Sequence, residues 1–315
     1  MKRRARRVLP FAVVVALATA APFVLSEFAT SLLAEILIWS ILAMGLDLLF
    51  GYTGMLSFGQ ALYFGVGAYG ITLGVTRLGW AFLPSLLLAV IAAGVAAGIA
   101  GFFAVRLTWH YFAIITIIFS LVLYFVALSR ADLTGGEDGM SFEVPPIVDF
   151  GGVELSVYEP LVEYYFVLIV TVISFLLLRL ITRSQLGLVF RALRDNTNRA
   201  SLLGYDTLRY RWVSFVIAGM FGGLSGALLA VKMRYASASY LFWTVSGDAV
   251  IWTVVGGAGT LVGPIVGTAT LITLRDYLST WFENHQLFTG LIAIVVVLTA
   301  PQGIVGLARR LTTRS

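Results

Sequence analysis

Two glycine-rich stretches with almost no charge interrupt a long series of apolar segments, at residues 51–70 and 256–267. Inside a bilayer, a backbone amide that leaves helical pairing costs several kcal/mol unless protein or a water-filled cavity satisfies it. Broken helices at membrane depth therefore usually line a path. The two stretches favour a membrane protein that carries something across.

Close helix packing is the alternative explanation for these glycines. Several lie four residues apart, a spacing that lets helices approach closely, as in Gly219/Gly223 and Gly222/Gly226. We assign packing to most of them. In the two long breaks, polar residues such as Ser57 and Gln60 stand among the glycines, and there we favour a path.

The composition supports a membrane protein. The chain is 59% hydrophobic and 12% charged, which is typical of polytopic membrane proteins and not of soluble domains. We expect an all-α polytopic membrane protein with about 8–10 transmembrane helices, some broken or re-entrant, in one permease domain over residues 1–315. The chain has no cysteine and two distant histidines, so we expect no metal site.

Apolar runs of about 20 residues predict bilayer-crossing helices. They lie near 8–26, 34–50, 60–78, 82–105, 111–128, 162–181, 212–231 and 286–300. The stretch 244–275 leaves three possibilities open: one broken helix, a re-entrant hairpin or two short helices. The basic start and the apolar run at 8–20 also resemble a secretory signal, and we favour an uncleaved signal anchor over a cleaved one.

Charge bias predicts the orientation of these spans. The 182–211 connection is rich in arginine and the 129–161 connection is rich in acids, so we expect 182–211 in the cytoplasm and 129–161 outside. The N-terminus would be cytoplasmic. An even number of crossings at 244–275, or a re-entrant hairpin, then keeps the basic C-terminal tail inside.

The two long connections each carry a further pattern. The outer one predicts a short strand or hairpin, and its acidic face suits either a soluble partner or solvent. The inner one predicts an amphipathic helix, since apolar residues recur at helical spacing at Leu186, Val189, Phe190 and Leu193. Such a helix would dock into a groove of another protein or lie on the inner membrane surface.

Five blocks of the sequence together carry a family resemblance. They are GLDLLFGYTGMLSFGQALYFGVGAY at 45–69, TGGEDGM at 134–140, SQLGLVFRALRDNTNRASLLGYDTLRYRWVSFVIAGMFGGLSGAL at 184–228, VVGGAGTLVGPIVG at 254–267 and APQGIVGL at 300–307. These blocks resemble the membrane-permease subunits of bacterial branched-chain amino-acid ABC transporters, the LivM type. They occur in the family's order and cover most of the chain.

The resemblance implies an ATP-driven importer in the bacterial inner membrane with several partners. These are a sister permease, two cytoplasmic ABC ATPase subunits and an extracytoplasmic solute-binding protein. The sequence lacks the phosphate-binding pattern G-x-x-x-x-G-K-[ST], so we expect ATP to be bound by the partner subunits and this chain to be no enzyme and to hold no cofactor.

The resemblance also implies that the segment 184–204 docks into the ATPase and relays its motion. The candidate coupling residues are Leu186, Gly187, Phe190, Arg191, Ala192, Arg194, Asp195, Leu203 and Gly204. Alternating access would follow, with the two breaks flanking the path. The candidate path residues are Thr53, Gly54, Ser57, Phe58, Gln60, Phe64, Tyr69, Gly257 and Thr260, with Phe58 and Phe64 as possible gates.

Three residues are unusual for their predicted positions. Asp47 lies within a span where relatives of the LivM type commonly carry asparagine. This departure indicates either a protonated carboxyl that acts as an amide-like hydrogen-bond donor or a different solute preference, and we favour a structural hydrogen bond. We place Asp248 near the interface, where it stays hydrated. His110 replaces a glycine that is usual in the family, and we assign it to the membrane interface rather than to a proton relay.

Two rival functions remain open. One is a urea or short-chain amide permease of the same ABC subfamily, and the other is a carrier driven by an ion gradient, which also uses broken helices. A membrane enzyme is disfavoured, because the sequence shows no paired carboxylates, no metal-ligand cluster and no nucleophile beside a base.

Overall fold

The structure, a computed structural model, describes residues 2–150, 153–282, 285–300 and 302–307, and it is dominated by helices. The membrane-length and shorter helices are α1 (Lys2–Val24), α2 (Glu27–Asp47), α3 (Gln60–Thr76), α4 (Phe82–Ala104), α5 (Trp109–Ser129), α6 (Ala131–Thr134), α7 (Pro160–Arg183), α8 (Gln185–Leu202), α9 (Thr207–Met233), α10 (Thr244–Gly256), α11 (Val262–Ser279) and α12 (His285–Thr299). A π-helix, η1 (Leu48–Thr53), and a 3-10 helix, η2 (Ala238–Leu241), complete them.

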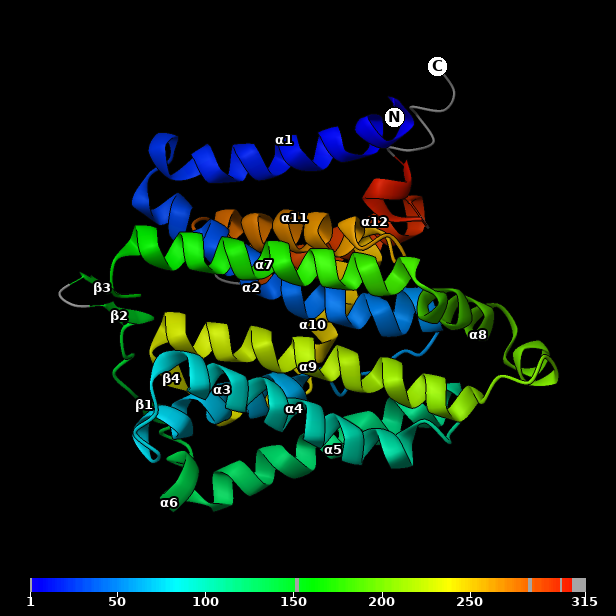
Figure 1. Cartoon of the computed structure of the whole chain (residues 1–315), viewed down its shortest axis with the longest axis horizontal. Coiled ribbons are helices and arrows are strands. Elements are labelled where there is room, and N and C mark those ends of the chain that lie inside the picture. The colour runs from blue at the N-terminus through cyan, green and yellow to red at the C-terminus, as the bar shows by residue number, and fades with distance from the viewer. Residues whose placement is uncertain (1, 151–152, 283–284, 301, 308–315) are drawn as a thin grey trace.

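Most of the long helices run side by side in one bundle (Figure 1). Among the described residues, five helical stretches are long and apolar enough to cross a membrane: Glu27–Thr53, Phe82–Ala104, His110–Ser129, Pro160–Arg183 and Thr207–Met233. Shorter apolar helices, among them Thr244–Gly256, accompany them. The predicted all-α polytopic fold is confirmed.

The helix α2 forms the centre of the bundle. Every residue from Ser40 to Asp47 is buried, and α7, α9, α10 and α11 pack around it. A helix that is apolar all round belongs in such a surrounded position. At its middle, the Ser225 hydroxyl of α9 donates a hydrogen bond to the Ile38 carbonyl at 2.7 Å, so the polar side chain is satisfied within the core.

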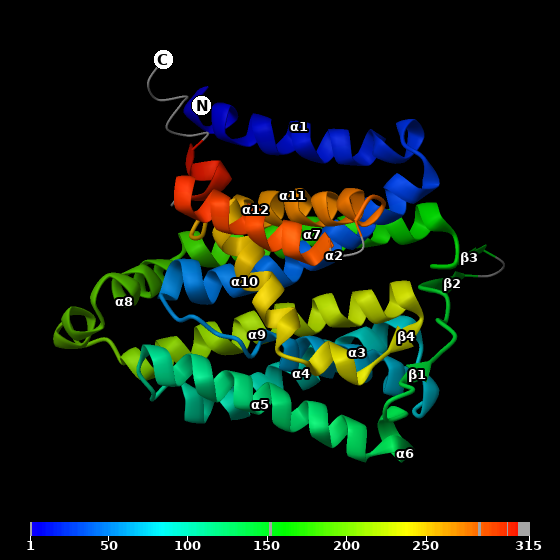
Figure 2. The ribbon, with the colours of Figure 1, turned by 180° about the vertical axis from the view of Figure 1, so that it is seen from behind.

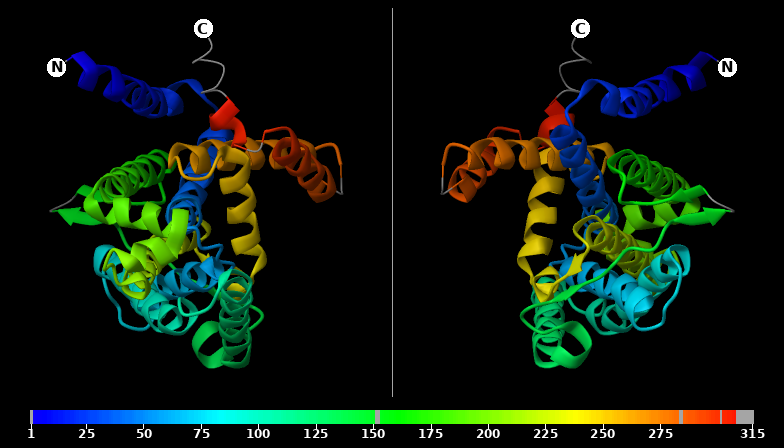
Figure 3. Two further views of the ribbon diagram at one scale, coloured as in Figure 1. Left: turned by 90° about the vertical axis from the view of Figure 1, so that its right-hand side faces the viewer. Right: turned by 90° about the vertical axis from the view of Figure 1, so that its left-hand side faces the viewer.

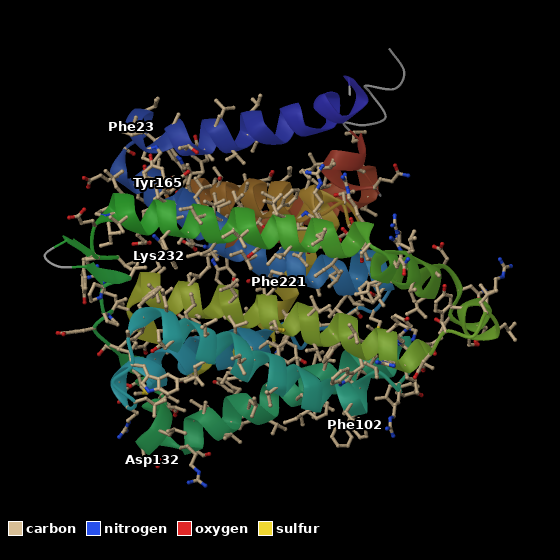
Figure 4. The ribbon with its side chains drawn as sticks, in the orientation of Figure 1. Phe23, Phe102, Asp132, Tyr165, Phe221 and Lys232 are labelled. Atoms are coloured by element: carbon tan, nitrogen blue, oxygen red, sulfur yellow. The ribbon has the colours of Figure 1, made fainter. Side chains whose placement is uncertain are left out.

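Small residues face inward and large ones outward on α4. Apart from Phe82 at its start, its buried residues are alanine, glycine and serine, including Ala93 and Ala97, whereas Leu87, Ile91 and Ile99 are each about three-fifths exposed. This is the arrangement expected where lipid is as apolar as the side chains and close backbone approach drives association. Phe102 on α4 and Phe23 on α1 likewise point away from the bundle (Figure 4).

Glycines bring α3, α4 and α9 close together, as predicted for most of them. A Cβ at Gly226 would overlap the Phe64 backbone, and one at Gly67 would overlap the Gly223 backbone. Gly98 is different, because the nearest atom to a Cβ there would be 3.5 Å away, an ordinary contact. The glycines of the α3–α9 crossing are therefore required for packing.

The two long connections lie at opposite ends of the bundle, and α8 is at the same end as the start of α1 and the end of α12 (Figures 1 and 2). The acidic connection contains β1 (Met140–Ser141), β2 (Val148–Phe150) and β3 (Val153–Leu155). β2 and β3 form the antiparallel hairpin that the sequence predicts. β1 pairs instead with β4 (Tyr235–Ala236), a contact that the sequence analysis missed.

The ambiguous stretch 244–275 consists of two helices. The chain leaves β4, passes through η2 and α10 to a loop at residues 257–261, and returns through α11. α10 runs steeply across the long helices at the edge of the bundle (Figure 3). The stretch thus forms two helices joined by a loop, and α12 then returns the chain to the end that holds α8 (Figure 2).

The helical breaks are shorter than the glycine-rich stretches that predicted them. The first covers η1 and residues 54–59, since α3 is regular from Gln60 onward. The second covers only 257–261, because α11 begins at Val262. Gly263 and Gly267 lie within α11. A Cβ at Gly267 would overlap the α10 backbone at Trp252, and one at Gly263 would overlap the Gly257 backbone in the loop. Glycine served close packing in these parts, not unwinding.

Candidate translocation and coupling site

Asp47 joins the two helical breaks. It is the last residue of α2 and is fully buried. Its Oδ1 accepts a hydrogen bond from the Gly259 N–H at 2.6 Å, and its Oδ2 accepts one from the Leu261 N–H at 3.1 Å. A loop between two helices leaves such N–H groups without helical partners. Asp47 satisfies them, so the structural hydrogen bond that we favoured is present, but the carboxyl group accepts from both N–H groups and does not act as the expected donor.

The loop at 257–261 has an irregular backbone that explains its need for an acceptor. Gly257 and Gly259 have φ values of 115° and 80°, and Leu261, which is not a glycine, has a φ of 57°. Thr260 closes the loop, because its hydroxyl donates to the Gly257 carbonyl and accepts from the Gly263 N–H, both at 2.8 Å. The predicted path residue Thr260 thus caps α11.

The π-helix η1 lies directly against this loop. A Cβ at Gly51 would overlap the Asp47 carboxylate and the Gly259 backbone, so only glycine fits. The Thr53 hydroxyl donates to the Leu48 carbonyl at 3.0 Å, and Gly54, whose φ is 77°, caps the C-terminal end of η1. π-helical turns of this kind are rare and often mark functional sites.

Arg194 of α8 connects to the same place. Its Nη1 donates a hydrogen bond to the Gly51 carbonyl, and its backbone and side chain pack on Gly54. We call Asp47, Gly51, Arg194, Gly259 and Leu261 the break junction. At this junction, Arg194 links α8 to the first break through the Gly51 carbonyl. The Asp47 carboxylate links the first break to the second through the N–H groups of Gly259 and Leu261.

α8 does not present its apolar stripe to the outside. Val189, Phe190 and Leu193 are buried within this chain, and α8 packs against η1, α7 and α9. The helical periodicity was interpreted correctly, but the groove that receives most of the stripe belongs to the chain itself. Leu186 is 39% exposed, whereas Leu202 and Leu203 at the far end are 87% and 76% exposed.

The remaining coupling candidates surround this stripe. Gly187 packs tightly on the Thr182 backbone, and Arg191 donates to the carbonyls of Gly187 and Thr182, each at 3.1 Å. α8 is kinked at Asn196, whose φ is −164°. Beyond the stripe, the exposed candidates are Leu186, Arg191, Arg194, Asp195, Leu203 and Gly204, with Ala192 half-buried.

The polar path candidates along α3 are buried and only partly satisfied. Ser57 accepts from the Gly59 N–H at 3.2 Å. Gln60 is fully buried, and neither amide atom has a hydrogen-bond partner among the described residues; the same holds for the Tyr69 hydroxyl. Buried polar groups without partners are uncommon, so Gln60 and Tyr69 remain the best polar candidates for a path.

The two aromatic candidates differ. Phe64 is fully buried, stacks on Trp39 with ring centroids 4.8 Å apart, and meets Tyr240 edge-on. Phe58 is half-buried, and its N–H donates to the Thr116 hydroxyl at 3.2 Å. Phe64 therefore belongs to the core of the bundle in this conformation.

The sequence analysis singled out Asp248 but missed two charged residues near it. Glu35 of α2 accepts from the Trp39 indole at 3.2 Å and lies 3.5 Å from Arg275 of α11. Arg275 also interacts electrostatically with Asp248 of α10. We call Glu35, Asp248 and Arg275 the charged cluster. The signal was present in the sequence: Glu35 lies at the start of the predicted span 34–50, and Arg275 lies at the end of the stretch 244–275.

The described residues hold a second ion pair. Lys232 of α9 donates to Glu163 of α7 at 2.9 Å and to the Ser31 hydroxyl at 2.8 Å. Figure 4 shows Lys232 between these helices, with Tyr165 of α7 reaching toward α1, where its hydroxyl donates to the Thr19 carbonyl at 3.0 Å. The Lys232 ammonium group is thus satisfied by Glu163 and Ser31, and we call Lys232 and Glu163 the closed ion pair.

Comparison with known proteins adds to this geometry. A family model described as "Branched-chain amino acid transport system / permease component" matches residues 28–300. The permease protein LivM of the high-affinity branched-chain amino acid transport system of Salmonella typhimurium is 26% identical over 313 residues, covering 93% of this chain and 73% of the relative, and LivM of Escherichia coli K12 matches equally. LivH of Salmonella typhimurium is 31% identical over 143 residues, covering 44% and 46%. No solved structure matches.

Proposed function

Because the chain belongs to the permease-component family of branched-chain amino acid transport systems, we propose that it forms half of the membrane path of an ATP-driven importer of branched-chain amino acids. A sister permease would form the other half. Two cytoplasmic ABC ATPase subunits would bind and hydrolyse ATP, and an extracytoplasmic binding protein would deliver the solute. This chain is a multi-pass membrane permease, and it is the transport subunit rather than an enzyme.

Matches to both LivM and LivH support the sister permease, since both relatives carry permease names from one kind of system. The charge bias supports a cytoplasmic N-terminus in the inner membrane, because the arginine-rich α8 and the acidic hairpin lie at opposite ends of the bundle. In this orientation the break junction lies near the cytoplasmic side.

The break junction is the observation that carries the coupling proposal. A movement of α8, imposed by the ATPase subunits, would act on the Gly51 carbonyl through Arg194 and on the 257–261 loop through Asp47. Irregular backbone at the ends of η1, α10 and α11 can change conformation at lower cost than a regular helix interior. The motion would thus reach both breaks together and alternate the access of the path.

The proposed function is tested by leucine uptake into proteoliposomes that contain this chain, its sister permease and the ATPase subunits. The binding protein is added on the extracytoplasmic side of the membrane, and ATP is supplied on the cytoplasmic side. We expect uptake to require every component and ATP hydrolysis. Uptake by this chain alone, driven by an ion gradient, would contradict the proposal. Preference for urea over leucine would support an ATP-driven importer but contradict branched-chain amino acids as its solute.

Replacing Arg194 with methionine tests the coupling step. The substitution removes the hydrogen bond to Gly51 but keeps an unbranched side chain of similar length, so we expect leucine uptake to fall about tenfold while ATP hydrolysis stays within about twofold. Arg199→Met removes the same charge from the exposed side of α8 and is the matched control. Equal uptake in both variants would show that the Gly51 contact does not transmit the motion.

A further inference from the structure

We propose that the charged cluster of Glu35, Asp248 and Arg275 contacts the charged groups of a zwitterionic α-amino acid as it crosses the membrane. This inference rests on the proposed function and gives the importer a solute contact inside the permease. It concerns residues on three helices, α2, α10 and α11; Arg275 contacts Glu35 and interacts electrostatically with Asp248.

All three residues lie well away from the break junction along their helices. At about 1.5 Å per residue, Glu35 lies about 18 Å before Asp47 along α2, and Arg275 lies about 20 Å beyond Val262 along α11. Asp248 lies one helical turn before Trp252, whose ring meets Trp39 edge-on with centroids 5.3 Å apart. Trp39 in turn donates to Glu35. The cluster therefore lies within the apolar part of the bundle, well away from the break junction.

The side chains of the charged cluster are partly exposed at the surface of this chain. The Arg275 and Glu35 side chains are 44% and 21% exposed, and Asp248 and the neighbouring Ile251 are exposed on α10. Charged side chains inside a membrane are costly and normally face a water-filled cavity or a partner rather than lipid. The side of α10 that carries Asp248 accordingly faces water or the sister permease.

The pairing inside the cluster is loose. The contact between Arg275 and Glu35 is 3.5 Å long and uses the Glu35 oxygen that Trp39 also occupies. No described residue donates a hydrogen bond to the Asp248 carboxylate, which interacts with Arg275 at longer range. By contrast, Lys232 and Glu163 meet at 2.9 Å with a serine completing the site. The cluster keeps free donors and acceptors, as a binding site requires.

The chemistry of an α-amino acid matches these free groups. Its ammonium group would be accepted by Asp248 and the second oxygen of Glu35, and its carboxylate would receive the remaining donors of the Arg275 guanidinium, a strong carboxylate partner. Partly exposed apolar surface lies alongside at Trp39, Val245 and Ile251, which suits a branched aliphatic side chain.

A buried polar group continues the line from the cluster toward the break junction. Trp39 stacks on Phe64, and Gln60 lies one helical turn from Phe64 on α3, toward the end of the bundle that holds α8. The Gln60 amide is fully buried and has no partner among the described residues. It would be the next polar contact for a solute that leaves the cluster.

Cysteine labelling tests whether the cluster faces water. The chain has no cysteine, so Asp248→Cys in the assembled transporter introduces a single thiol into this subunit. The partner subunits are made cysteine-free, and the comparison variant is Ile91→Cys, at a position that is 58% exposed on the apolar face of α4. We expect a charged methanethiosulfonate reagent to modify the Asp248→Cys variant at least about tenfold faster than the Ile91→Cys variant. Equal, slow labelling at both positions would overturn the proposal.

Uptake kinetics test the contact with solute. In the full transporter with saturating binding protein, we expect Asp248→Asn and Arg275→Gln each to lower leucine uptake about tenfold, while ATP hydrolysis stimulated by the binding protein stays within about twofold. Glu163→Gln disrupts the closed ion pair and should change neither measurement. Loss of uptake and ATP hydrolysis together, or unchanged uptake, would contradict a solute contact.

The two experiments separate this inference from the proposed function. If the unaltered assembly shows no ATP-dependent leucine uptake, the proposed function fails, whatever the labelling at position 248. If the unaltered assembly imports leucine but the cluster variants behave like Glu163→Gln, the function stands and the solute contact is wrong.

Discussion

Asp47→Ala is expected to leave little folded permease in the membrane. The substitution removes the only side-chain acceptor that the structure shows for the buried N–H group of Leu261 and the partly buried N–H group of Gly259. A buried donor left without a partner costs about 1–3 kcal/mol and a partly buried one at most as much, so the pair costs about 1–6 kcal/mol. This is a large part of the total stability of a typical protein, about 5–15 kcal/mol.

Asp47→Asn is expected to give an intermediate result. The asparagine oxygen can still accept from Gly259, but its NH₂ group would face the Leu261 N–H, donor against donor. Thermal unfolding in detergent, followed by the loss of the monodisperse peak in size-exclusion chromatography, measures both variants. Asp132→Ala on the exposed helix α6 is the control. An unchanged midpoint for Asp47→Ala would mean that other groups satisfy the 257–261 loop.

The second large effect is expected from Gly226→Ala at the crossing of α9 and α3. The added methyl group would overlap the carbonyl of Phe64, which is backbone and cannot rotate away. Overpacking of a tight core typically costs about 1–3 kcal/mol, and a backbone clash lies at the upper end. Gly226→Val should be more damaging still, because a branched side chain needs more room.

Gly98→Ala provides the matched comparison. It is also a glycine to alanine change inside a membrane helix, but its Cβ would have its nearest neighbour 3.5 Å away. Alanine favours a helix over glycine by about 1 kcal/mol, so the unfolding midpoint should stay level or rise. Equal destabilisation by both variants would show that the α3–α9 contact is not the limiting one.

The course of the helices could be predicted from the sequence because it depends on local patterns. Runs of apolar residues located the spans, and turn residues located the β2–β3 hairpin. The β1–β4 pairing is only two residues long on each side, too short to leave a periodic pattern. The extent of the breaks was overestimated, since glycine marks both unwound backbone and close helix contact, and only the folded chain separates the two.

The break junction could not be predicted, because its contacts join residues far apart in the chain. Asp47 and Gly259 are 212 positions apart, and Arg194 and Gly51 are 143 apart. A single sequence identifies an acid in an apolar span as unusual but does not say which backbone groups it serves. For the same reason the stripe on α8 was recognised as amphipathic, while its partner turned out to be this chain's own η1, α7 and α9.

The hairpin of α10 and α11 is held at its closed end by the bonds from Asp47, and the two arms pack through Gly256, Gly263 and Gly267. Mechanically it is a lever with its fulcrum at the 257–261 loop. Arg275 lies about 20 Å and Asp248 about 13 Å from that fulcrum. A tilt of about 10° would therefore displace Arg275 by about 3.5 Å, enough to open its contact with Glu35. A small rotation at the 257–261 loop thus becomes a full change of electrostatic partner far from that loop.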